Sequence, residues 1–261
     1  MNSREQQLQA FDRLLTIMDE LREQCPWDKK QTWESLRHLT IEETYELGDA
    51  ILDRNLKEIK KELGDLLLHI VFYAKIGSEE KAFDIADVAN AVCDKLIVRH
   101  PHIYGDVKAE TDEDVKKNWE KIKLKEGRKS VLEGVPRSLP AMVKASRIQD
   151  KVAGVGFDWD SIDGVFDKVK EEIEELHKEV KDQNLSNIEA ELGDVFFSLI
   201  NYARFLKVNP EDALERTNKK FIQRFQYLER TAEAKGKALK DMTLAEMEQY
   251  WQEAKAIPHL H

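Results

Sequence analysis

One acidic pattern occurs twice in the chain, and this duplication constrains the fold more than any other feature. The first copy comprises Glu42, Glu43 and Glu46 with Glu62-Leu63-Gly64-Asp65, and the second comprises Glu171, Glu172 and Glu175 with Glu191-Leu192-Gly193-Asp194. Each acid of the first copy has its counterpart 129 residues further on, as Glu42 has in Glu171. Acids three and four residues apart lie on one face of a helix. We therefore expect two copies of one helical unit.

The spacing of apolar residues predicts an all-α fold, and no run of residues is typical of a series of β-strands. In the first half we expect helices over 8–21 with a stop at Cys25-Pro26-Trp27-Asp28, across the first acids, over 56–76 with an end at Gly77-Ser78, and from Asp84 to Arg99. Thr40 is a possible cap of the first acidic helix, although the repeat favours an earlier start. In the second half we expect helices over 161–181, from 185 after a turn at 182–184, and from Asn209-Pro210.

Glycine and proline mark a candidate linker between the two halves. They occur at Gly127, Gly134, Pro136 and Pro140. We expect an amino-terminal domain over residues 1–126, a linker over 127–135 and a carboxy-terminal domain over 136–261. Each half ends with a tryptophan that a lysine follows four residues later, at Trp119/Lys123 and Trp251/Lys255.

Composition excludes several classes of function. A net charge of −10 argues against nucleic acid as the main partner, because contacts to its backbone need concentrated Lys and Arg. The longest apolar stretch, 66–74, contains His69 and is too short to cross a membrane. The polar start of the chain does not have the apolar region of a signal peptide. The two cysteines, Cys25 and Cys93, form no disulfide framework and suit a reducing compartment, so we expect a cytoplasmic enzyme.

The second acidic copy predicts a site for a hard cation. Glu172 and Glu175 share one helix face, and Glu191 and Asp194 form the facing pair on the next helix. The short turn between the two helices makes them antiparallel neighbours, so the four carboxylates converge. An all-oxygen set of ligands suits Mg²⁺ or Mn²⁺ better than zinc or copper. A di-iron bundle is disfavoured, because it needs Glu-x-x-His pairs that the helices do not offer.

A solvated charged face is the alternative interpretation of the same acids. Lys168, Lys170 and Lys178 are spaced to form ion pairs with them along the helix. The recurrence of the whole pattern, Leu-Gly-Asp included, favours the cation site. Gly193 in mid-helix costs about 1 kcal/mol relative to alanine. Either a ligand or a closely packed helix near its backbone would explain that cost.

These motifs together resemble those of the MazG nucleoside triphosphate pyrophosphohydrolases. The resemblance rests on the duplicated acidic pattern, on Cys25-Pro26-Trp27-Asp28 and Gly156-Phe157-Asp158, and on Arg99-His100-Pro101-His102 and Arg137-Ser138-Leu139-Pro140-Ala141. It covers nearly the entire chain and matches the two-domain bacterial form. It implies two helical-bundle domains in tandem, a homodimer, and Mg²⁺-dependent hydrolysis of NTPs and dNTPs to NMP and pyrophosphate with broad tolerance of the base.

The resemblance also assigns roles to residues of the second half. The implied metal ligands are Glu172, Glu175, Glu191 and Asp194. Glu171 is the candidate to orient or deprotonate the attacking water, and Glu171 and Glu172 are the implied catalytic pair. The implied substrate-binding residues are Lys168, Glu171, Glu172, Asn201, Lys220, Arg224 and Trp251. Surface charge for the basic residues and helix packing for Trp251 are the alternatives.

The two copies differ around their acids. Lys168 corresponds to Leu39, Asn201 to Phe72, and Asn218-Lys219-Lys220 to Cys93-Asp94-Lys95. The first copy, with Glu43, Glu46, Glu62 and Asp65, thus has fewer groups that attract a triphosphate. We expect the main active site in the second half, with the first copy structural, dimerising or weakly active. A nucleotide-binding regulator without turnover and a purely helical scaffold are the competing functions.

Overall fold

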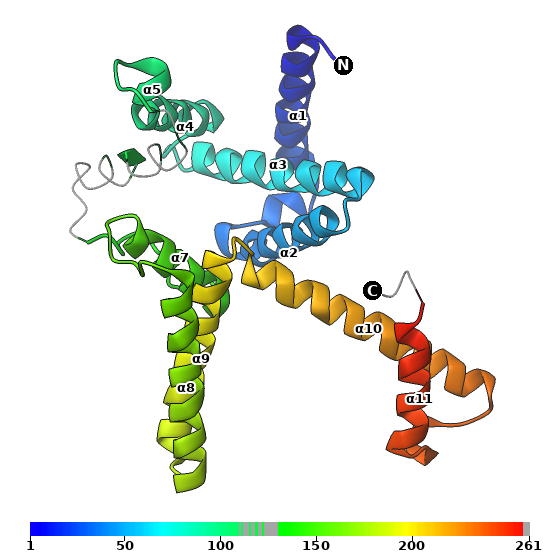
Figure 1. Cartoon of the computed structure of the whole chain (residues 1–261). Coiled ribbons are helices and arrows are strands. Elements are labelled where there is room, and N and C mark those ends of the chain that lie inside the picture. The colour runs from blue at the N-terminus through cyan, green and yellow to red at the C-terminus, as the bar shows by residue number, and fades with distance from the viewer. Residues whose placement is uncertain (110, 112–114, 116–117, 120–121, 123–129, 258–261) are drawn as a thin grey trace. The chain divides into compact units, whose positions relative to one another are not determined.

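We describe a computed structural model of the chain that covers residues 1–261 except 110, 112–114, 116–117, 120–121, 123–129 and 258–261. Lys123 and residues 127–129 of the expected linker therefore lie outside the described residues. Every regular element in the described part is a helix, which confirms the all-α prediction (Figure 1). The chain divides into two compact units, Met1–Thr111 and Asp112–His261.

The amino-terminal unit is built around the pair of helices that carries the first acidic copy. Its elements are α1 (Arg4–Gln24), η1 (Asp28–Lys30), α2 (Trp33–Leu52), α3 (Leu56–Glu79), α4 (Ile85–Arg99) and α5 (Pro101–Tyr104). α2 and α3 pack side by side, and α1 packs on α3. Met18, Leu36 and Phe72 join these three helices in one buried core.

The carboxy-terminal unit repeats this arrangement and extends it. Its elements are α7 (Ala141–Ala153), α8 (Ile162–Asp182), α9 (Leu185–Phe205), α10 (Pro210–Ala234), η2 (Leu239–Asp241) and α11 (Leu244–Lys255). α8 and α9 form a long antiparallel pair, and Gln183 makes the turn between them with a left-handed φ of 54°. α10 leaves this pair and packs along α11 around Leu228 and Tyr250 (Figure 1).

The structure resolves one helix boundary that the sequence left open and extends another. Thr32 caps α2 in a reciprocal capping box with Ser35, so the cap of this helix lies eight residues before Thr40 and the start is earlier, as the repeat indicated. The Thr40 hydroxyl instead lies 2.8 Å from the Tyr73 hydroxyl, in the interface with α3. α3 continues through Gly77 to Glu79. A Cβ at position 77 would lie 2.9 Å from the Phe83 ring, so this glycine makes room for a contact that sequence spacing does not reveal.

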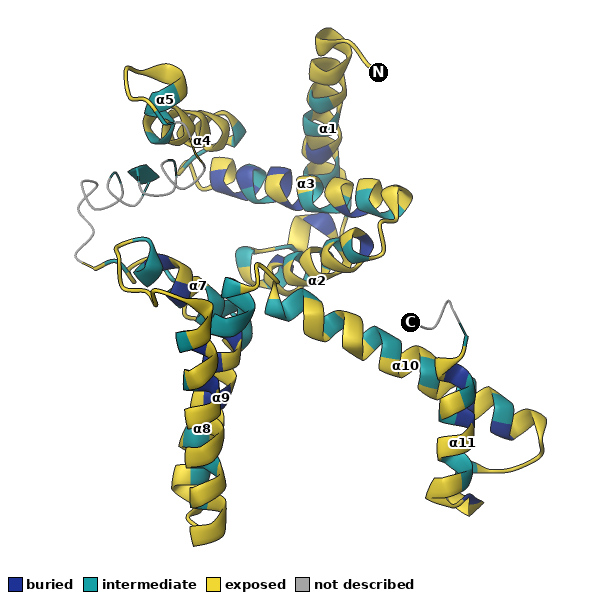
Figure 2. Cartoon of the chain, viewed as in Figure 1, coloured by how far each residue is buried: buried dark blue, intermediate teal, exposed yellow. Residues whose placement is uncertain are grey.

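Exposed residues run along the helices of each unit (Figure 2), and many of them are large apolar side chains. On α9, Leu192, Phe196 and Leu199 follow one another at helical spacing and are 40%, 55% and 43% exposed. A Cβ at Gly193 would meet no atom within 4 Å, so no packed helix within the described chain accounts for that glycine. None of the described helices is long and apolar enough to span a membrane. Cys25 and Cys93 are free thiols.

Candidate functional site

The acids of the second copy converge at the seam between α8 and α9. Carboxylate oxygens of Glu172, Glu175 and Glu191 all lie within 4.8 Å of one another. Glu172 is only 6% exposed, whereas Glu175 is open to solvent and Glu191 is half-buried. Asp194, one turn further along α9 than Glu191, lines the adjoining cavity together with Glu172. A mostly buried carboxylate beside three others forms an acidic site that opens to solvent on one side.

Burial and the neighbouring acids affect the titration of Glu191. Burial raises the pKa of the Glu191 carboxyl, and the neighbouring carboxylates, led by Glu175 and Asp194, raise it further. Both effects disfavour the charged form of the carboxyl, so a bound cation would stabilise the cluster. Carboxylate oxygens within 4.8 Å of one another form a set of donors that suits a hard divalent cation. The residues present therefore fit Mg²⁺ or Mn²⁺.

Lys168 supplies the positive charge next to these acids. Its Nζ lies 2.6 Å from Glu172 and 2.8 Å from Glu171, both on the next turn of α8. The hydrogen bonds that Lys168 donates to Glu171 and Glu172 raise the pKa of its ammonium group. The lysine side chain is 35% exposed, so it reaches solvent as well as the buried carboxylate. The structure thus brings together three of the residues expected to contact substrate.

A small cavity of about 160 Å³ adjoins the acids. Its walls come from α8, α9 and the loop before α8: Trp159, Val165, Lys168, Glu172, Asp194, Phe197, Ser198 and Asn201. Asn201 is fixed there, because its Oδ1 accepts hydrogen bonds from the Arg204 guanidinium at 2.8 and 3.0 Å. Its amide nitrogen is consequently the end that can donate to a bound molecule.

Lys220, Arg224 and Trp251 lie elsewhere in the unit. Lys220 and Arg224 are on α10, and none of the three is among the residues that line the acidic cavity. Trp251, on α11, packs against Phe221 with ring centroids 4.9 Å apart and contacts the core that joins α10 and α11. Within the described residues of one chain, Trp251 is thus a packing residue, and its predicted role in substrate binding stays a prediction.

The loop before α8 contributes two residues, Asp158 and Trp159, that the sequence analysis did not assign to the site. Asp158 forms a two-point ion pair with Arg204 of α9, with one N–O distance of 2.9 Å. Burial alone would raise the pKa of Asp158, but the Arg204 guanidinium and the Trp159 backbone N–H together outweigh burial and hold the pKa below its usual value. Trp159 lines the acidic cavity. The repeated Trp27-Asp28 and Phe157-Asp158 motif marked this loop, but its spacing did not reveal that the next residue lines the acidic cavity.

The first acidic copy has the same cluster in a different setting. Oxygens of Glu43, Glu46 and Glu62 lie within 4.8 Å of one another. Burial, then the neighbouring acids, raise the pKa of the Glu43 carboxyl. Here the positive charge comes from α3, where Lys61 pairs with Glu62 at 2.8 Å, and Glu62 Oε2 has no hydrogen-bond partner among the described residues. The acids alone therefore do not distinguish the two halves.

What separates the halves is the space beside the acids. The positions equivalent to Lys168 and Asn201 are Leu39 and Phe72. Phe72 is 2% exposed and packs with Met18 and Leu36 in the core, and Leu39 packs against it. In the first half, apolar side chains thus occupy the positions whose counterparts line the acidic cavity in the second half.

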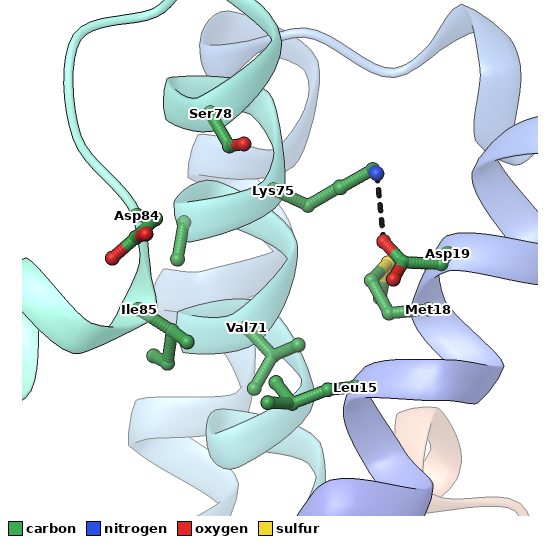
Figure 3. Close-up of a pocket in the computed structure, with 9 residues that line it drawn as sticks. Leu15, Met18, Asp19, Val71, Lys75, Ser78, Asp84 and Ile85 are labelled. Atoms are coloured by element: carbon green, nitrogen blue, oxygen red, sulfur yellow. Dashed lines mark ion pairs between the residues drawn. The ribbon is translucent and has the colours of Figure 1, made fainter.

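The cavity found in the amino-terminal unit is of another kind. It has a volume of about 250 Å³ and lies between α1, α3 and the start of α4 (Figure 3). Leu15, Val71 and Ile85 form its apolar walls, and an ion pair of 2.6 Å joins Asp19 to Lys75 at one side. None of its lining residues belongs to the first acidic cluster.

Comparison with known proteins agrees with this geometry. The family model described as MazG nucleotide pyrophosphohydrolase domain matches residues 31–104 and 162–228, and each segment contains one acidic copy. The chain is 43% identical over 257 residues to the nucleoside triphosphate pyrophosphohydrolase of Escherichia coli K12, which covers 95% of this chain and 98% of that protein. It is 44% identical over 250 residues to the nucleoside triphosphate pyrophosphohydrolase/pyrophosphatase MazG of Thermotoga maritima, covering 94% and 95%. The resemblance predicted from the motifs is confirmed.

Proposed function

The chain belongs to the MazG nucleotide pyrophosphohydrolase family, and on that premise we propose that it hydrolyses nucleoside triphosphates and deoxynucleoside triphosphates to NMP and pyrophosphate. One observation carries the assignment of the site. The second acidic cluster adjoins a cavity whose lining includes a cation and a fixed amide, Lys168 and Asn201, whereas the equivalent Leu39 and Phe72 pack in the core of the first half. A triphosphate carries about four negative charges, so such groups favour its binding.

Glu172, Glu175, Glu191 and Asp194 would hold Mg²⁺, or Mn²⁺ in its place. When bound, the ion supplies neutralisation of phosphate charge while the bond between the α- and β-phosphates breaks. The proximity of oxygens from three of these side chains, within 4.8 Å, supports this set.

Lys168 and Glu171 would act on the substrate and on water. Lys168 now pairs with both glutamates of α8. With the carboxylate of Glu172 holding a cation, the Lys168 ammonium would be available to a phosphate oxygen. Glu171 is then released from its ion pair, and its exposed carboxylate orients the attacking water and accepts its proton. Asn201 donates its amide N–H to the substrate in the same cavity.

We propose further that the working form is a homodimer. Uncovered apolar side chains along α9 support this, as does Gly193, whose backbone leaves room for a second helix. Lys220, Arg224 and Trp251 lie on α10 and α11, away from the walls of their own acidic cavity. A second copy could bring these side chains to the triphosphate, where arginine binds phosphate oxygens in a bidentate way.

The division of labour between the halves is part of the proposal. We assign residues 1–126 to an amino-terminal domain that is structural or weakly active, 127–135 to a linker, and 136–261 to the catalytic domain. The filling of the first cavity by Leu39 and Phe72 supports this. We place the enzyme in the cytoplasm, where the thiols of Cys25 and Cys93 stay reduced.

Product analysis tests the reaction. The chain is incubated with a panel of NTPs and dNTPs with and without Mg²⁺, and the products are separated. We expect NMP and pyrophosphate, formed only with the metal. NDP and phosphate would refute the proposed bond cleavage. Tight Mg²⁺-dependent binding of the nucleotide without formation of NMP would indicate a regulatory function instead of hydrolysis.

A further inference from the structure

A second, larger cavity lies directly beside the acidic one in the carboxy-terminal unit. It has a volume of about 540 Å³ and is bounded by α7, α9 and the loop over residues 156–160. Trp159, Phe197 and Asn201 line both cavities, so the two are neighbours that share a wall. A volume of this size falls in the range of small-molecule sites, which is about 300–1,000 Å³.

We propose that this cavity binds the nucleobase and sugar of the substrate, with Trp159 as the stacking surface and Gln149 as the hydrogen-bond acceptor for the base. The inference rests on the proposed function for the identity of the ligand. Breaking the α–β bond requires the α-phosphate to lie at the acids. The nucleoside is bonded directly to that phosphate, so its pocket must adjoin the acidic cavity, as this one does.

Trp159 is held in place for stacking. A Cβ added at Gly164 would lie 3.1 Å from the indole Cε3, so the ring rests against the first turn of α8. The indole is nevertheless 47% exposed, and Phe157 at the same rim is 79% exposed. Aromatic rings in such positions bind bases of any identity, because every base has a π face.

Gln149 provides the polar contact. The residue is 4% exposed, and its Nε2 donates to the Phe197 carbonyl oxygen at 2.8 Å. A carbonyl accepts only from a donor, so the amide orientation is fixed with the oxygen on the other side. Gln149 Oε1 has no hydrogen-bond partner among the described residues, and the side chain lines the cavity. A buried acceptor without a donor is costly, and an N–H of a bound base would satisfy it.

This pairing accounts for broad base tolerance. Each of the common bases presents at least one N–H donor on its Watson–Crick edge, and flipped-out bases are read there by hydrogen bonds combined with stacking. A single acceptor can therefore form a hydrogen bond with each of the common bases, but it disfavours a base without any N–H donor. The two features of the cavity predict affinity for nucleosides in general, and discrimination against one chemical class.

Binding measurements with non-hydrolysable ligands test the proposal independently of turnover. The dissociation constants of the α,β-methylene analogues of ATP and of purine riboside triphosphate, whose base has no N–H donor, are measured with Mg²⁺. We expect the unmodified chain to bind the ATP analogue about 5- to 100-fold more tightly. Gln149→Leu should bring this ratio close to one. The ratio is an internal control, since both ligands meet the same folded fraction of the variant.

Trp159→Ala should weaken both ligands by about 5- to 100-fold. Trp27→Ala is the matched control, because Trp27 is an exposed tryptophan (55%) in the equivalent loop of the first copy. Equal affinities for the two analogues in the unmodified chain, or equal effects of the two tryptophan substitutions, would overturn the proposal. Failure to produce NMP and pyrophosphate would overturn the proposed reaction instead, and leaves these binding ratios as a separate result.

Discussion

Replacing Lys168 by methionine tests the electrostatics of the acidic site. The Lys168–Glu172 pair is 2.6 Å long and has one buried member, since the Glu172 side chain is 8% exposed. At this distance two unit charges interact by about 1.6 kcal/mol at the dielectric constant of water and by about 6 kcal/mol at an effective value of 20. Lys168 is 35% exposed, which places the pair near the lower figure. We expect Lys168→Met to reduce the free energy of unfolding by about 1–2 kcal/mol at pH 7 without metal.

Lys170 offers a matched control on the same helix. It pairs with Asp167 at 2.7 Å, but the two side chains are 53% and 71% exposed. Such a pair contributes at most about 0.5 kcal/mol, so Lys170→Met should barely change stability. Calorimetry or thermal unfolding by circular dichroism should show a midpoint about 2–8 °C lower for Lys168→Met.

Magnesium supplies the second half of this test. A bound cation neutralises the carboxylates that Lys168 otherwise pairs with, so the stability difference should narrow as Mg²⁺ saturates the site. Equal effects of the two lysine substitutions would refute the argument from burial. A difference that is independent of Mg²⁺ would refute the link between Lys168 and the cation site.

Three further predictions follow from individual contacts. Asp158→Asn removes the ion pair with Arg204 and should lower the free energy of unfolding by about 1–2 kcal/mol at pH 7. Because Arg204 lowers the pKa of Asp158, this contribution is present above the ordinary aspartate pKa and is lost as the pH falls through the folded-state pKa. The unfolding midpoints of the variant and the parent, measured over acidic pH, should therefore converge. Phe72→Ala should cost about 3–5 kcal/mol in urea unfolding, because Phe72 is 2% exposed in the first core. Phe196→Glu should convert a dimer to a monomer in sedimentation experiments, whereas Leu244→Glu, at an exposed position on α11, should not; a Phe196→Glu dimer would contradict the proposed α9 interface.

Local patterns predicted much of the fold and of the acidic site. Three- and four-residue spacing put Glu172 and Glu175 on one face, and the short turn at 182–184 brought Glu191 opposite them. The helix starts at Asp84 and Asn209 were predicted from capping, in which a side chain bonds backbone groups only a few residues away. These features depend on neighbours along the chain, which is why periodicity and capping reveal them.

Contacts between distant segments were not predictable in this way. Gly77 was expected to end its helix, but it makes room for Phe83. Comparison of the halves identified Phe72 as the counterpart of Asn201, but only the structure shows that its ring fills the space with Met18 of α1. The role of Trp159 depends likewise on packing against Gly164 and on the meeting of two cavities. Such effects depend on tertiary packing, which has no sequence period.

The proposed functions of the two acidic clusters differ because the second adjoins a cavity suited to the nucleotide, whereas Leu39 and Phe72 pack in the core beside the first. We would measure pyrophosphate release from ATP with Mg²⁺ for Glu172→Ala and Glu43→Ala side by side, which tests this difference between the two clusters. These residues are equivalent in the repeat, and each belongs to one of the two clusters. The account predicts that Glu172→Ala abolishes turnover while Glu43→Ala retains most of it. Loss of turnover in Glu43→Ala with activity retained in Glu172→Ala would contradict the account.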